Sequence, residues 1–206
     1  MKDQGHYIAS PAAPGDYVVG AGEKLDLFYF VHPGEDRDIR VRVHLTGPGA
    51  SVSLAGVYLS GGSEKVSIHT EIYHEAQGCT SDQLFNGIAS GSAAVSFYGR
   101  IVVAPGADRT EAYQVNHNIV LSDKAKVDTR PQLEIYADDV KCSHGATVGS
   151  LNADEEFYMR SRGIPQKEAK VLQMISFVAP VLERIADPGE RERTAAEVEE
   201  AIRKML

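Results

Sequence analysis

Two residues in a strand-like stretch near the middle of the C-terminal half could take part in metal chemistry. Cys142 and His144 lie two positions apart within residues 132–149. In an extended segment, residues i and i+2 point to the same face, so a thiolate and an imidazole would be presented together. Iron and zinc both accept sulfur and nitrogen ligands. Two residues make an incomplete site, and the pair also fits a buried cysteine beside a hydrogen-bonded histidine.

The other candidate groups also have structural explanations. Cys79 lies in a turn-like stretch, where we expect a structural thiol rather than a ligand. His117 lies in an Asn-His-Asn segment, where a hydrogen-bonded coil corner is favoured over a metal site. Arg160 and Arg162 could form salt bridges at a helix end or could face a partner.

Motifs of the familiar enzyme classes are missing from the sequence. There is no G-x-x-x-x-G-K-[ST] loop, no G-x-S-x-G elbow and no H-E-x-x-H pair. The glycine-rich turns are not followed by helical patterns, so none resembles a dinucleotide-binding fingerprint. We therefore predict that the chain is not an enzyme and carries no ATP site.

Composition narrows the class of protein further. The chain has 206 residues, a hydrophobic fraction of 43% and a formal net charge of -8. An acidic surface repels phosphate backbones, so nucleic acid is not an expected partner. No apolar run approaches the roughly 20 residues of a membrane helix, and the N-terminus lacks the apolar core of a signal peptide. With two cysteines and no disulfide framework, we expect a cytoplasmic protein with free thiols.

Residues 1–150 have the pattern of a β protein. Short runs of alternating apolar and polar residues, clearest at 39–45, are separated by glycine-containing turns, which suggests a sandwich, a barrel or a β-solenoid. The segments 50–52, 93–95 and 125–127 each follow a turn and begin a strand-like run. This weak, irregularly spaced internal repeat favours the solenoid. The expected inward positions are Val41, Val43, Val52, Leu54, Val95, Phe97, Leu133 and Ile135.

The pattern becomes helical over residues 151–206. Asn152 is the expected N-cap of a helix that stops at Gly163. A second helix is expected over 166–185, kinked or split at Pro180, and a third over 190–206. The apolar side of the third helix, formed by Val198, Ile202 and Met205, is interpreted as an exposed docking surface.

Longer motifs resemble a known family. PQLEIYADDVKCSHGATVG, followed by FYMRSRGI, resembles the C-terminal signature of the SufB/SufD family of iron–sulfur cluster assembly proteins. LAGVYLSGG and GRIVVAPGADRTEAYQVNHNIVLSDKAKVD extend the match, which covers about residues 25–185. The C-S-H-G sequence at 142–145 resembles the SufD branch, because SufB typically has an acidic residue at the places of Ser143 and Gly145.

The resemblance implies a fold and a set of partners. The implied fold is mainly β: a right-handed parallel β-helix over residues 1–150, followed by a small C-terminal helical domain over 151–206 that binds a SufC-type ATPase. A SufB-type scaffold, or a second copy in a homodimer, would pair with the β-helix near its C-terminal end. A nascent iron–sulfur cluster or iron would be held transiently there and shared with the partner. His144 is the implied ligand, with Cys142 as its neighbour.

One departure from the family and two rival functions remain open. Family members are usually about twice this length, so the missing coils would leave an apolar solenoid end exposed unless something covers it. In one rival, the chain is a purely structural adaptor in which the C-S-H-G motif only packs. In the other, it is a metal-dependent β-helical enzyme that uses Cys142 and His144.

Overall fold

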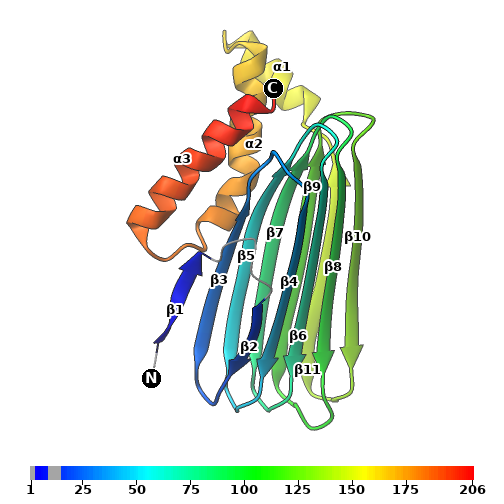
Figure 1. Ribbon diagram of the computed structural model, residues 1–206, viewed down its shortest axis with the longest axis vertical. Helices are drawn as coiled ribbons and strands as arrows, with labels where there is room; N and C mark the ends of the chain where they lie inside the picture. The colour runs from blue at the N-terminus through cyan, green and yellow to red at the C-terminus, as the bar shows by residue number, and fades with distance from the viewer. Residues whose placement is uncertain (1–2, 9–14) are drawn as a thin grey trace.

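The computed structural model describes residues 3–8 and 15–206, with side chains from residue 15 onward. In this part the chain forms a parallel β-solenoid of about five turns, followed by three C-terminal helices (Figure 1). The strands are β1 (Asp3–Ile8), β2 (Gly15–Val19), β3 (Lys24–Val31), β4 (Arg37–Leu45), β5 (Ser51–Ser60), β6 (Lys65–His74), β7 (Thr80–Ala89), β8 (Ala94–Val103), β9 (Thr110–Val120), β10 (Lys126–Ile135) and β11 (Val140–Gly149). The helices are α1 (Ala153–Ser161), α2 (Gln166–Leu182) and α3 (Pro188–Lys204).

The strands form two sheets that face each other. The first sheet has the order β1-β3-β5-β7-β9-β11, and the second has the order β10-β8-β6-β4-β2. The chain crosses from one sheet to the other at each turn, so every coil adds one strand to each sheet. Neighbouring strands within a sheet are parallel, and each inward position therefore stacks on the matching position of the next coil.

The predicted solenoid is confirmed, and most of the predicted inward residues lie in its core. In β6, for example, every second residue from Val66 to His74 is buried. Of the eight predicted inward residues, the six in the earlier coils are at most 3% exposed: Val41, Val43, Val52, Leu54, Val95 and Phe97. Leu133 and Ile135 also take inward positions, in register with Ile101 and Val103 of β8, but Leu133 is only partly buried and Ile135 is 42% exposed. Both lie in β10, the last strand of the second sheet, where no further coil covers them.

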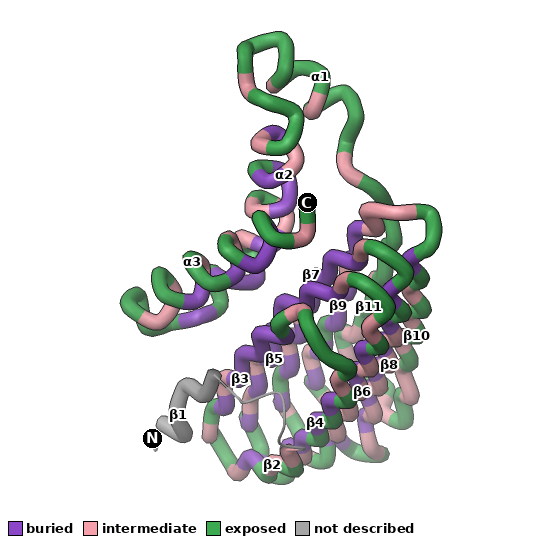
Figure 2. Tube along the Cα trace, turned by 45° about the horizontal axis from the view of Figure 1, so that its top comes forward, coloured by how far each residue is buried: buried purple, intermediate pink, exposed green. Residues whose placement is uncertain are grey.

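The helices cover the outer face of the first sheet. Side chains of α2 and α3 form one apolar cluster with outward-facing residues of β3 and β5, among them Phe28, Phe30 and Val57. Figure 2 shows the buried side of α2 and α3 turned toward these strands. The predicted docking surface on α3 is therefore wrong, because Val198 and Ile202 are 1% and 0% exposed. The prediction of an amphipathic third helix was correct, but the apolar side of that helix packs against the first sheet and α2 of the same chain.

The helix boundaries follow the expected local signals. The Asn152 side-chain oxygen accepts hydrogen bonds from the backbone N–H groups of Asp154 and Glu155, as the N-cap prediction requires. Gly163 follows α1 with a φ of 89°, a conformation that glycine adopts without strain. The expected split at Pro180 does not occur, because this proline lies in the last turn of α2 and the helix ends two residues later.

The early coils are covered at their N-terminal side. Leu25 and Leu27 of β3 are 3% and 2% exposed, and β3 and β4 are paired by β1 and β2 respectively. The expected exposed apolar end is thus not seen at these positions. The stretch in which the sequence predicts no signal peptide lies partly outside the described residues. None of the described helices is long and apolar enough to cross a membrane.

A buried histidine lies between the two sheets. His74, at the end of β6, is fully buried, and its Nε2 atom is 2.8 Å from Ser81 Oγ in β7. Burial lowers the pKa of His74 to about 4, because the interior disfavours the charged imidazolium. The folded protein therefore binds fewer protons at this side chain than the unfolded chain does between these two pKa values.

This burial predicts a pH-dependent stability. The free energy of unfolding should be highest above the ordinary histidine pKa of about 6.5 and should fall by up to about 3 kcal/mol as pH drops toward 4. His74→Gln should remove this part of the slope, measured by urea unfolding across the pH range. His69→Gln, on the outer face of the second sheet, controls for the loss of a histidine. Parallel curves for the wild type and His74→Gln would contradict the assignment.

Candidate functional site

The candidate site lies at the C-terminal end of the solenoid, in the last coil. β10 and β11 are the last strands of their sheets, and no described strand pairs with their outer edges. Burial weakens in this coil, and Figure 2 shows the loss of buried positions from the inner strands to β10 and β11. The unpaired backbone N–H and C=O groups of these two edges are able to accept a strand from another chain.

Cys142 and His144 both take inward positions of β11. Cys142 is paired in register with Ala112 of β9, and His144 with Gln114. Ala112 and Gln114 are both 0% exposed, so this column of the solenoid points to its interior. Cys142 and His144 thus share one face, as their spacing predicted. Because no coil follows, His144 is exposed and Cys142 is half-buried.

The protonation of Cys142 limits what the isolated pair can do. The thiol packs against the small apolar cluster of Ile101, Val103, Ala107 and Ala112. This burial raises the pKa of Cys142 above its ordinary value, so the thiol stays protonated at neutral pH. A metal ion binds the thiolate, and metal binding must therefore displace this proton.

Cys142 and His144 alone would make an incomplete metal site. Across residues 15–206, no group of three or more histidine, cysteine, aspartate or glutamate side chains is arranged to hold a metal ion. The His144 side chain makes no hydrogen bond or ion pair within the part of the chain that the structure describes. An exposed imidazole thus lies beside a half-buried thiol, at an open end whose strand edges pair with no described strand.

The remaining sequence candidates lie apart from this pair. Cys79 is 0% exposed, and its thiol is 3.3 Å from the carbonyl oxygen of Gly47. The His117 ring lies 2.7 Å from the Thr147 hydroxyl, across β9 and β11. In α1, the Arg162 guanidinium lies 5.4 Å from the centre of the Tyr158 ring, and Arg160 lies 3.9 Å from Glu156.

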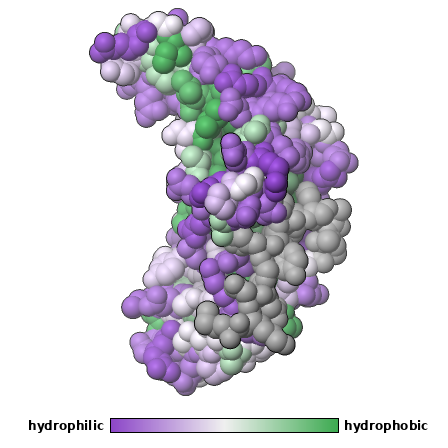
Figure 3. Space-filling model, turned by 90° about the vertical axis from the view of Figure 1, so that its left-hand side faces the viewer, coloured by the Kyte–Doolittle hydropathy of each residue, from purple (hydrophilic) through white to green (hydrophobic). Residues whose placement is uncertain are grey.

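Two exposed apolar surfaces were missed by the sequence analysis. No residue of α1 is buried, and the exposed fractions are 73% for Phe157, 60% for Tyr158 and 40% for Leu172 of α2. We call these three residues the α1–α2 patch. In Figure 3, apolar atoms form a strip that descends from the top of the view, at the level of α1 and α2. The signal that could have been used is the composition of α1, in which two aromatic residues stand in an otherwise mostly polar helix.

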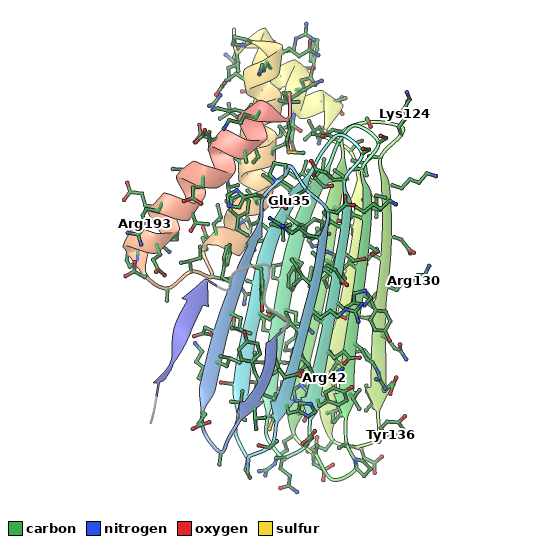
Figure 4. All side chains as sticks on the ribbon, in the orientation of Figure 1. Glu35, Arg42, Lys124, Arg130, Tyr136 and Arg193 are labelled. Carbon is green, nitrogen blue, oxygen red and sulfur yellow. The ribbon has the colours of Figure 1, made fainter. Side chains whose placement is uncertain are left out.

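The second surface is the rim of the last coil. Ile135, Tyr136 and Val148 are 42%, 60% and 49% exposed. Figure 4 shows Tyr136 and Arg130 at the β10 side of the solenoid, pointing away from it. These apolar groups surround the mouth in which Cys142 and His144 lie, so that a chain docking on the edges would also cover them.

Comparisons with known proteins identify the relatives of this chain. Residues 17–177 match the family model described as the SufBD core domain of SUF system FeS cluster assembly. The chain is 38% identical over 154 residues to the iron–sulfur cluster assembly protein SufD of Escherichia coli K12, a match that covers 75% of this chain and 36% of that protein. It is 30% identical over 160 residues to the SufD of Bacillus subtilis 168, covering 78% of this chain and 37% of that protein. A SufBD family protein of Synechocystis is 45% identical over 105 residues, covering 51% of this chain and 23% of that protein. The chain thus spans well under half the length of these relatives.

The two thiols should differ in reactivity for the reasons given above. In the native chain, iodoacetamide should modify Cys142 more slowly at neutral pH than it modifies an exposed cysteine peptide, with the rate still rising at pH values where the peptide has levelled off. Cys79 should stay unmodified until the chain unfolds. Mass spectrometry of wild type and Cys142→Ser would assign each site. Faster modification of Cys142 than of the peptide would show that the thiol is activated instead.

Proposed function

Because the chain belongs to the SufB/SufD family of the SUF system for iron–sulfur cluster assembly, we propose that it is a SufD-like scaffold subunit that assists cluster assembly or iron acquisition by supplying ligands. In this proposal the chain catalyses no reaction of its own and works in the cytoplasm. The observation that carries it is the position of His144 and Cys142 together at the open mouth of the last coil. The cluster or iron is the cargo, held transiently.

The incomplete ligand set calls for a second scaffold chain. We infer a SufB-type partner, or a second copy of this chain, whose strands pair with the free edges of β10 and β11. Such pairing would cover Ile135, Tyr136 and Val148 and would bring further ligands to the mouth. Cluster assembly would then depend on formation of the complex, because neither chain alone holds a full set of ligands.

The helices provide a second binding surface, which we assign to a SufC-type ATPase. The α1–α2 patch is the exposed apolar part of the helical region, whereas the apolar side of α3 is buried against the first sheet. Aromatic side chains such as Phe157 and Tyr158 are common anchors of protein interfaces. ATP hydrolysis would then belong to that partner, which is consistent with the lack of a phosphate-binding loop in this sequence.

The exposure of His144 also bears on the two rival functions. A purely structural motif would place the imidazole in a packed, hydrogen-bonded position, whereas His144 is exposed and makes no hydrogen bond in the described residues. A metal-dependent enzyme would need a more complete ligand set than the described residues bring together. Both observations support the shared ligand role over the alternatives.

Substitution of the two ligands tests the proposal directly. In a complex reconstituted with the SufB-type and SufC-type partners, His144→Ala should lower the bound iron and sulfide severalfold, and Cys142→Ser should lower them less. Because His144 is exposed, the melting temperature of the His144→Ala variant should stay within about 2 °C of that of the wild type. A normal cluster yield from a correctly assembled His144→Ala complex would rule out the ligand role.

The α1–α2 patch predicts the behaviour of a second set of variants. Phe157→Asp should weaken binding of the SufC-type ATPase by about thirtyfold or more, as loss of an aromatic anchor does, and should change the stability by less than about 0.5 kcal/mol. Isothermal titration calorimetry would measure the affinity. Val18→Asp, at an exposed apolar residue of β2, is the matched control.

Truncation before α1 would be a poorer test, because it would uncover the apolar cluster between the helices and the first sheet. Equal affinities of Phe157→Asp and Val18→Asp for the ATPase would place its binding site elsewhere.

A further inference from the structure

A change from apolar to polar residues occurs along one inward column of the first sheet. Leu27 and Leu54 occupy this column in β3 and β5. Gln83 in β7 and Gln114 in β9 continue it, and His144 in β11 ends it. The interior of the solenoid directly beneath His144 is therefore lined by two amide side chains instead of leucines.

The two amides are buried without partners. Gln83 and Gln114 are both 0% exposed, and within the described residues neither the oxygen nor the nitrogen of either side chain has a hydrogen-bond partner. The hydroxyl of Thr70, in the facing strand β6, is buried in the same way. Buried amides without partners are costly and are rare in folded proteins, so a group or a water molecule that satisfies them is expected.

The glycine at position 99 keeps space for the outer amide. Gly99 lies in β8, in register with Thr70 of β6. A Cβ atom added at Gly99 would lie 1.7 Å from Nε2 of Gln114, so the amide fills the space that a side chain at residue 99 would occupy. A leucine in place of Gln114 would continue the apolar column of the earlier coils. Instead, a polar side chain, Gln114, lies in the strand adjacent to the candidate ligand His144.

We propose that Gln114 is a positioning residue for His144. Register neighbours on adjacent strands lie about 4.8 Å apart, which places the Gln114 amide within reach of the imidazole directly or through one water molecule. Because neither group has a protein partner in the described residues, the link runs through a water molecule, which accepts the N–H of one ring nitrogen and donates to the amide oxygen, leaving the other nitrogen free to bind metal. Histidine ligands commonly have their second nitrogen held in this way. Gln83 lies in register with Gln114, one coil deeper, and so is not adjacent in register to His144.

The orientation itself can be tested on the chain without metal or partners. Long-range ¹H–¹⁵N spectra of the histidine-labelled chain, recorded where the imidazole is neutral, report which ring nitrogen of His144 carries the proton. One tautomer should dominate in the wild type, and the nearly isosteric Gln114→Met should reduce its excess by a factor of about three to ten, the effect of losing one neutral hydrogen bond. Gln83→Met, one coil deeper, is the matched control and should have a smaller effect.

Two results would overturn the proposal: no tautomer excess in the wild type, or equal changes in Gln114→Met and Gln83→Met. Gly99→Ala gives an independent perturbation, because it keeps the amide and displaces it. It should also shift the tautomer ratio, and an unchanged ratio in this folded variant would count against the proposal.

The role of Gln114 in assembly rests on the proposed function, and the two can fail separately. If Gln114 positions a ligand, Gln114→Met should lower the cluster yield of the reconstituted complex by less than His144→Ala does. If Gln114→Met shifts the tautomer ratio but His144→Ala gives a normal cluster yield, Gln114 does orient the imidazole and His144 is not a cluster ligand. If Gln114→Met leaves the tautomer ratio unchanged but His144→Ala gives a low cluster yield, His144 is a ligand that Gln114 does not orient.

Discussion

Parallel, in-register stacking of the coils is the constraint from which the rest of this structure follows. Each inward position is covered by the matching position of the next coil, so the identity of a side chain and its burial are decided along columns. In the middle coils this produces a closed apolar core. At β10 and β11 the same geometry presents Cys142 and His144 with nothing above them. A site at the end of a solenoid is therefore formed by interruption of the stack, and its reactive groups are those that another coil would have buried.

The outer faces of the two sheets differ in polarity and in what covers them. The first sheet is apolar outside along β3, β5 and β7, where α2 and α3 cover it, with Asn86 Nδ2 donating to the backbone oxygen of Phe177 across the contact, at 2.6 Å. The second sheet is polar outside and has no described helix over it. Its strands are linked by charged pairs such as Arg42 with Glu71 and Arg100 with Glu134, both at 2.7 Å. Partly exposed pairs of this kind contribute little individually, and the stacking itself holds the sheet together.

How far the sequence predicts this molecule depends on whether a pattern is local. Alternation over residues 39–45 predicted β4 and its inward side, because burial at every second residue leaves a direct trace in the sequence. β7 was not predicted as a strand, because its inward residues Ser81 and Gln83 are polar and hide the alternation. The sequence analysis recognised the apolar face of α3 but predicted that another protein binds it. Amphipathicity shows that a helix face will be covered and does not identify the surface that covers it. The pairing of Cys142 with His144 followed from spacing, whereas the amide beneath His144 depends on register between β9 and β11, which no single segment contains.

The cover on the first sheet has a consequence for how the chain is made. Phe28 and Phe30 emerge from the ribosome early, yet the residues that shield them, such as Val178 and Val198, are synthesised roughly 150 positions later. The coils can stack as they appear, because each contacts only its neighbours. Their outer apolar face nevertheless stays open to water until the helices arrive. During that interval the uncovered apolar face raises the risk of aggregation, and the risk lasts until α2 and α3 have been synthesised.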